Sequence, residues 1–150
     1  MGHQLHTDID ISAPPEVVWT VLTDLDGYSE WNPFIVEASG DVAIGSKLVN
    51  RMQPPGGKGM TFKPTVTVLE RARTFEWLGR PVVPGIFDGR HRFDLVATPS
   101  GGTHLTHTEK FSGVLVRSMR KSLDTHTHAG FLAMNEALKT QAEALAGARS

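Results

Sequence analysis

The sequence predicts an α+β domain in which a curved antiparallel sheet is covered by one long C-terminal helix. Strand-like segments follow one another through the middle of the chain with short turn-rich connections, which favours antiparallel pairing. Two short helical segments precede most of these strands, and the last third of the chain has an apolar pattern of helical period. A sheet and a helix that each have one apolar face bury both faces when the helix lies across the sheet.

The first strand and two short helices are predicted before residue 34. Apolar and polar residues alternate in "LHTDIDISAP", as in a half-buried strand. Pro14 and Pro15 suit the first turn of a helix. That helix carries an apolar stripe of Val18, Val21, Leu22 and Leu25. The segment "YSEWN" forms a second short helix, which Pro33 ends because the residue before a proline disfavours helical geometry.

The remaining strands and the long helix are predicted from residue 34 onward. Turn-forming segments such as "PPGGKG", "PVVPG" and "TPSGG" separate six strands, at approximately 34–40, 45–53, 60–70, 73–80, 86–97 and 103–116. From about 118 to 146, the apolar residues of one amphipathic helix recur at helical spacing: Leu123, Phe131, Met134, Leu138, Ala142 and Leu145. The prediction is thus seven strands in one domain that spans residues 1–150.

Composition excludes several classes of protein. The formal net charge is -1, so no strong field attracts nucleic acid or an anionic membrane surface. The chain has no cysteine, which excludes a disulfide scaffold, a thiolate metal site and a cysteine nucleophile. No apolar run has the length of a membrane span, and the N-terminus lacks a signal-peptide region. We therefore expect a cytoplasmic monomer or homodimer that does not insert stably into membranes.

Strand phase directs three titratable side chains toward the apolar face of the sheet. In "IFDGRHRFDLV" the charged residues occupy alternate positions, so they face solvent and His91 points inward with its phenylalanine neighbours. In "THLTHTEKFSG" the inward set includes His107 and Glu109. A five-residue loop between the two strands places His91 opposite Glu109 and Phe93 opposite His107. A three-residue loop places His91 opposite Phe111 instead, and both registers are consistent with the sequence.

Burying two imidazoles and a carboxyl group costs free energy unless each finds a partner. One explanation is a hydrogen-bonded structural network within the core. The other is a polar end of an apolar cavity, where the three groups orient a ligand. The same side chains have the ligand types of a zinc or iron site, but their spacing is not diagnostic, so we predict neither a metal nor another cofactor.

Several segments resemble the START-like superfamily, also called the SRPBCC or Bet v 1-like helix-grip group. The matching pieces are "ISAPPEVVWTVLTDLDGYSEWNPFI", "MTFKPTVTVLE", "FEWLG", "GIFDGRHRFDL" and "THLTHTEKFSGVLV", followed by the long helix. They are most similar to the bacterial polyketide cyclase/dehydrase branch. This resemblance implies a helix-grip fold, a seven-stranded sheet around the C-terminal helix, with an elongated apolar cavity between them.

The resemblance implies three functions. The first is binding, and possible transport, of a small hydrophobic molecule such as a lipid, a sterol or a polyketide. The second is a polyketide cyclase or dehydratase-like enzyme, in which His91, His107 and Glu109 are the candidate groups for general acid–base catalysis. The third is a protein-interaction module, since some members of the superfamily assist chaperones.

The candidate ligand-binding residues combine these inferences. Trp31 and Phe34 are expected to close one end of the cavity, because the resemblance places their segment there. The full set contains the aromatic, methionine and inward-facing polar residues of the sheet and the long helix: Trp31, Phe34, Met52, Phe62, Trp77, Phe87, His91, Phe93, His107, Glu109, Phe111, Phe131, Met134 and Leu138.

Overall fold

The computed structural model describes residues 2–81 and 83–149 of the chain. The strands are β1 (His3–Ile11), β2 (Ile35–Ser39), β3 (Val49–Met52), β4 (Met60–Phe62), β5 (Thr65–Glu70), β6 (Thr74–Gly79), β7 (Asp88–Ala97) and β8 (Thr103–Ser112). The helical segments are α1 (Pro15–Thr23), a 3-10 turn (Leu25–Gly27), α2 (Tyr28–Trp31), α3 (Val116–Ser122), a π-helical segment (Leu123–Thr127) and α4 (His128–Arg149).

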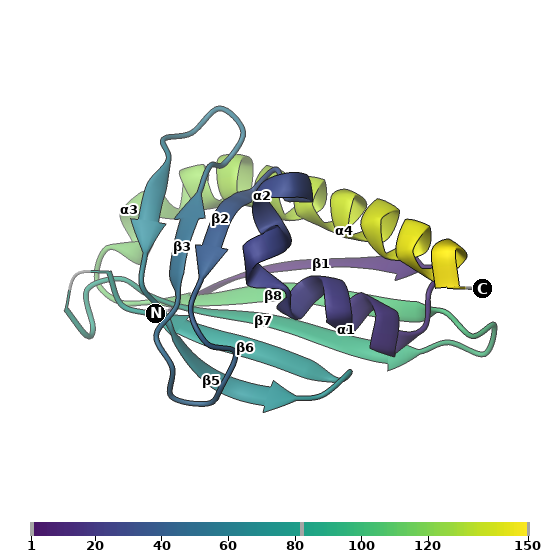
Figure 1. Cartoon of the computed structure of the whole chain (residues 1–150). Helices are drawn as coiled ribbons and strands as arrows, with labels where there is room; N and C mark the ends of the chain where they lie inside the picture. The colour runs from purple at the N-terminus through teal and green to yellow at the C-terminus, as the bar shows by residue number, and fades with distance from the viewer. Residues whose placement is uncertain (1, 82, 150) are drawn as a thin grey trace.

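The strands form two antiparallel sheets, and α4 runs lengthwise beside the larger one (Figure 1). The larger sheet has the order β1-β8-β7-β6-β5 and the smaller one the order β2-β3-β4. The structure confirms the predicted α+β class, with an antiparallel sheet, two short helices between the first two strands and a long C-terminal helix. It is a helix-grip arrangement, as the resemblance implied.

The prediction of seven strands in one sheet was wrong. The segment 60–70 divides into β4 and β5 at Pro64, because proline has no N–H with which to continue a strand ladder. Residues 45–48 also leave the predicted third strand and bond to the start of β5 instead. The Leu48 N–H donates to the Pro64 carbonyl over 2.8 Å, and the Val66 N–H donates to the Ser46 carbonyl over 2.9 Å. These bonds connect the edges of the two sheets.

The chain is helical from Val116 to Arg149, a longer stretch than the predicted 118–146. The strand predicted to reach residue 116 ends at Ser112, because Gly113 adopts a φ of 117° that turns the chain away from the sheet. The five-residue π-helical segment interrupts the helix at Leu123. Such segments are rare and concentrate at functional sites. None of the helices in residues 2–81 and 83–149 has the length and apolar character required to cross a membrane.

The strands β7 and β8 pair in the register that a five-residue loop produces. His91 lies opposite Glu109, and Phe93 lies opposite His107. The three inward-facing groups therefore come together on one face of the sheet. Of the two registers consistent with the sequence, the structure selects the one that makes His91 and Glu109 neighbours.

The core lies between this face of the larger sheet and α4. Phe131, Met134 and Leu138 of α4 are fully buried there, and complete burial of one such side chain stabilises the fold by about 1.5–3 kcal/mol. Gly130 allows α4 to approach the ring of Phe34 closely, since a Cβ atom at this position would lie 2.3 Å from Cδ1 of that ring. The glycine therefore serves packing between α4 and the segment that enters β2.

Candidate ligand-binding cavity

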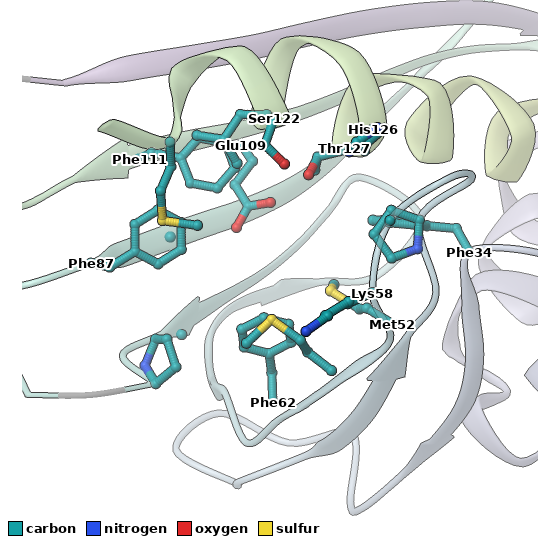
Figure 2. A pocket seen from close by; sticks show the side chains of 18 of the residues that line it. Phe34, Met52, Lys58, Phe62, Phe87, Glu109, Phe111, Ser122, His126 and Thr127 are labelled. Carbon is teal, nitrogen blue, oxygen red and sulfur yellow. The ribbon is translucent and has the colours of Figure 1, made fainter. Parts of the chain in front are cut away.

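An open cavity of about 700 Å³ lies at one end of the larger sheet. Its wall comes from the loop between β3 and β4, the adjoining ends of β6, β7 and β8, and residues between Leu115 and Thr127 at the start of the C-terminal helical stretch (Figure 2). This volume lies within the range of small-molecule sites in proteins. The lining comprises Phe34, Met52, Pro54, Gly56, Gly57, Lys58, Met60, Phe62, Pro64, Trp77, Gly79, Pro81, Phe87, Gly89, Glu109, Phe111, Leu115, Met119, Ser122, Leu123, His126 and Thr127.

Two paired glycines provide part of this space. Gly79 of β6 lies directly opposite Gly89 of β7, and both residues line the cavity. Gly79 has the same strand parity as the buried Trp77, so a side chain at position 79 would project into the cavity. A Cβ atom on Gly89 would lie 2.3 Å from Oε2 of Glu109. The second glycine therefore makes room for the carboxyl group itself.

The lining is mainly apolar and adaptable. Phe87 and Phe111 stack with their ring centroids 5.6 Å apart and form one side of the wall. Methionine side chains at positions 52, 60 and 119 add flexible thioethers, which adjust to ligands of different shape. An apolar molecule that enters this space loses its water-exposed surface, which is the main favourable term in such binding.

A few polar side chains interrupt the apolar wall. Figure 2 shows Ser122 and Thr127 projecting into the cavity from the helical side, with the Glu109 carboxyl group beside them and Lys58 reaching in from the loop between β3 and β4. His126 lies close to that loop, since an added Cβ atom on Gly56 would be 3.5 Å from its Cδ2 atom and one on Gly57 would be 3.4 Å from its Cβ atom. The loop therefore closes over the π-helical segment.

Glu109 is the acidic residue of the lining. Its side chain is 13% exposed, and that small area belongs to the cavity wall. Burial raises the pKa of Glu109 to about 8, because a carboxylate loses solvation when it leaves water. A carboxyl group with this pKa is largely protonated at neutral pH. It then offers one hydrogen-bond donor to a ligand rather than a full negative charge.

His91 and His107 lie behind Glu109, away from the cavity, and both rings are fully buried. Their Nε2 atoms are 2.7 Å apart, which is hydrogen-bonding distance. Burial lowers the pKa of His91 to about 3. Burial and the neighbouring His91 also lower the pKa of His107 well below its ordinary value. Both imidazoles are therefore neutral near pH 7, and one ring donates to the other.

Seven of the residues predicted to contact a ligand line the cavity: Phe34, Met52, Phe62, Trp77, Phe87, Glu109 and Phe111. The other seven lie outside its lining: Trp31, His91, Phe93, His107, Phe131, Met134 and Leu138. Most of these are fully buried in the core behind the wall. Trp31 packs edge-on against Tyr28, with a centroid separation of 5.2 Å.

Sequence reasoning missed the helical part of the wall. The predicted strand extended to residue 116, so Leu115, Met119 and Leu123 were not recognised as one apolar face that reaches the cavity. Their spacing of four residues was the available signal. The segments "PPGGKG" and "PVVPG" were predicted as turns between strands, and the first contributes Pro54 and Lys58 to the lining and the second contributes Pro81. Among the residues that the structure describes, no group of three His, Asp or Glu side chains is placed to hold a metal ion.

The antiparallel sheet, the long C-terminal helix and the apolar cavity define a helix-grip protein with an open apolar cavity. The family model described as "Polyketide cyclase / dehydrase and lipid transport" matches residues 2–144. The chain belongs to this family, which agrees with the resemblance seen in its sequence. No protein with a curated description matches the sequence.

Solved structures share this fold at low sequence identity. The Zhui aromatase/cyclase from Streptomyces sp. R1128 is 17% identical, with a TM-score of 0.78 over 95% of this chain and 94% of its own. TTHA0849 from Thermus thermophilus is 15% identical, with a TM-score of 0.76 over 95% of this chain and 99% of its own. Ara h 8.0201 is 14% identical, with a TM-score of 0.64 over 93% and 99%. At these identities the likeness establishes the fold.

Proposed function

We propose that this protein binds a small, mainly hydrophobic molecule in the cavity, of the lipid, sterol or polyketide kind. The observation that carries the proposal is an apolar space of about 700 Å³ with few polar groups, among them Glu109. This composition is typical of sites that gain affinity from apolar burial and orientation from one or two hydrogen bonds. The family description, which names both polyketide chemistry and lipid transport, agrees with it. The cytoplasmic location and the monomeric or homodimeric state stay predictions.

A ligand carried through purification provides the first test. Native mass spectrometry of freshly purified protein, compared with its denatured mass, is expected to reveal a bound molecule of a few hundred daltons. If the protein is empty, a thermal-shift screen of sterols, fatty acids and aromatic polyketides replaces this measurement. The proposal fails if no molecule is retained and no member of the screen stabilises the fold.

A cavity-filling variant connects any such binding to this site. Leucine at position 79 would occupy the space beside Gly89, and the nearest heavy atoms to its Cβ lie 3.8 and 3.9 Å away, so the backbone accepts it. We expect Gly79→Leu to weaken ligand binding at least tenfold while the protein stays folded. The control is Thr61→Leu, an exposed position on β4 outside the cavity lining. Equal binding by both variants would place the ligand elsewhere.

The second candidate function is a cyclase or dehydratase-like enzyme. The observation that favours it is the Glu109 carboxyl group at the cavity wall, whose pKa of about 8 suits proton transfer near neutral pH. If the ligand identified above is converted to a product, Glu109→Gln should stop conversion but retain binding. The third candidate, an interaction module, predicts a filled domain with a large exposed apolar patch. The cavity favours the first two functions.

A further inference from the structure

A continuous hydrogen-bonded chain leads from the backbone of the core to the cavity. The Thr7 hydroxyl donates to the backbone carbonyl of His107 over 2.9 Å. A carbonyl can only accept, so this bond uses the one hydroxyl proton. The Asn135 side chain, 2.8 Å from the same hydroxyl oxygen, must therefore present its NH₂ group there. These two bonds fix the orientation of the Asn135 amide.

The fixed amide determines the tautomers of both histidines. The Oδ1 atom of Asn135 lies 2.7 Å from Nδ1 of His107 and can only accept, so His107 carries its proton on Nδ1. In a neutral ring the Nε2 atom is then bare and must accept. It therefore receives the Nε2 proton of His91, 2.7 Å away. This assignment leaves Nδ1 of His91 with a lone pair and no proton.

At the cavity, the hydrogen-bonded chain of side chains ends beside Glu109. The Nδ1 atom of His91 lies 3.3 Å from Oε1 of Glu109. No hydrogen bond joins these two atoms, and the buried nitrogen is left without a partner among the described residues. A carboxylate facing this lone pair would be repelled, whereas a protonated carboxyl group would donate to it or share its proton with a ligand.

Among the residues that the structure describes, the other charged groups around the cavity form no ion pair with Glu109. From β1, His3 pairs instead with Asp124, over 2.6 Å. Lys58 and His126 line the same cavity, but among the described residues the only basic nitrogen within 4.0 Å of Glu109 is that of the buried, neutral His91. The raised pKa of Glu109 agrees with this isolation.

We propose that Thr7, Asn135, His107 and His91 are positioning residues that hold Glu109 as a protonated hydrogen-bond donor, and that the cavity therefore takes neutral ligands with an acceptor oxygen rather than cationic ones. The ligand class rests on the proposed function, whereas the proton arrangement does not. A hydroxyl, ether or carbonyl oxygen accepts from the carboxyl group. An ammonium group can only donate hydrogen bonds, so it would require Glu109 as a carboxylate, the form that the hydrogen-bonded side chains disfavour.

The proton arrangement is tested first, without any ligand. We expect ¹⁵N NMR of histidine-labelled protein at pH 7 to show two neutral rings with opposite tautomers, His107 protonated at Nδ1 and His91 at Nε2. His91→Gln and His107→Gln assign the signals by their loss. An imidazolium at either position, a proton on Nδ1 of His91 or a proton on Nε2 of His107 would overturn the proposal. Every other placement of protons on the two histidine rings would give one of those signals.

The ligand class is tested with decanol and decylamine, which share one alkyl chain and differ in the head group. Both are used below the concentration at which decylamine forms micelles. At pH 7 we expect decanol to bind at least tenfold more tightly than decylamine. Glu109→Gln should keep this preference, because its amide is also a neutral donor, and should keep it at pH 9, where the wild-type preference declines. The exposed Glu136→Gln on α4 is the charge-matched control and should behave as the wild type at both pH values.

The outcomes separate the two proposals. Equal affinity for both probes at pH 7, or loss of decanol binding in Glu109→Gln, would overturn the assignment of Glu109 as a donor. Binding of neither probe, together with the expected tautomers, would instead overturn the proposed function and support the hydrogen-bonded chain. If the hydrogen-bonded chain had only a structural role, the preference of the wild type for decanol over decylamine would not change with pH.

Discussion

The contact between Gly130 and Phe34 predicts that a helix-stabilising substitution will destabilise this protein. Alanine is favoured over glycine inside a helix by about 1 kcal/mol. At position 130, however, the new Cβ atom would lie 2.3 Å from Cδ1 and 2.6 Å from Cε1 of Phe34. Phe34 is 1% exposed, and its ring packs against Phe131 at a centroid distance of 5.6 Å. The ring has little room to move, except toward the cavity that it lines.

The two effects have opposite signs, and the steric one is larger. Overpacking a core costs about 1–3 kcal/mol, so we expect Gly130→Ala to lower the free energy of unfolding by up to about 2 kcal/mol. For a chain of this size, 2 kcal/mol corresponds to a fall in Tm of roughly 4–8 °C. Urea unfolding followed by circular dichroism measures the difference directly.

Two further variants make the result specific to this contact. Gly147→Ala lies on the same helix. Apart from its chain neighbours and the nearby backbone of that helix, no heavy atom of the described residues would lie within 4 Å of the added Cβ atom, so we expect this variant to raise stability slightly or leave it unchanged. Phe34→Leu should rescue part of the loss in a Gly130→Ala background, with a coupling energy of about 1 kcal/mol. If Gly130→Ala is as stable as the wild type, or if Phe34→Leu does not change its effect, the reasoning is refuted.

Two other predictions concern buried carboxyl groups. The pKa of Glu109 is about 8 in the folded protein and near 4.5 in the unfolded chain. Between these pH values the folded state binds more protons than the unfolded state. The free energy of unfolding therefore falls as pH rises through this window. Glu109→Gln should therefore gain stability over the wild type from pH 5 to pH 9 in urea titrations; a constant difference would contradict the raised pKa. On the outer face of β6, burial raises the pKa of Glu76, but hydrogen bonds from Arg90, Thr67 and Arg92 outweigh this effect and lower it. Ionised Glu76 therefore stabilises the fold above about pH 4.5, and this stabilisation is lost as pH falls through the folded pKa. We expect Glu76→Gln to lower the free energy of unfolding by about 1–3 kcal/mol at pH 7 and by less in acid. An equal cost at pH 3 and pH 7 would show that the ion pairs do not stabilise the fold.

The sequence was sufficient to predict the elements whose patterns are periodic. The apolar stripes of α1 and α4 and the inward phase of β7 and β8 follow from local spacing, and all are seen in the structure. The division of the predicted strand 60–70 was also visible in principle, because Pro64 interrupts it. Its partner segment 45–48 was not, since that segment chooses between two neighbouring strands through contacts distant in the sequence.

The candidate site was predicted only in part, because strand phase states which face a side chain occupies but not what covers that face. His91, His107 and Glu109 all point inward as predicted, yet α4 covers the two histidines, and only Glu109 lines the cavity. The difference depends on where the π-helical segment ends and α4 begins, and no local pattern fixes that position. The pairing of Gly79 with Gly89 likewise depends on the register between β6 and β7.

The buried histidines were explained from the sequence either as a structural network or as part of a ligand site, and the structure suggests that these explanations are not alternatives. Apolar residues of similar volume can replace a buried polar network at little cost to stability, so stability alone gives a weak reason to keep this one. A purely structural network should also satisfy all its members. Here the core end is fully satisfied through Thr7 and Asn135. At the cavity end, beside Glu109, Nδ1 of His91 has no hydrogen bond to any residue that the structure describes. The hydrogen bonds of this chain are thus complete inside the core and incomplete at the cavity. A binding site requires this arrangement if its last proton is to be shared with a ligand.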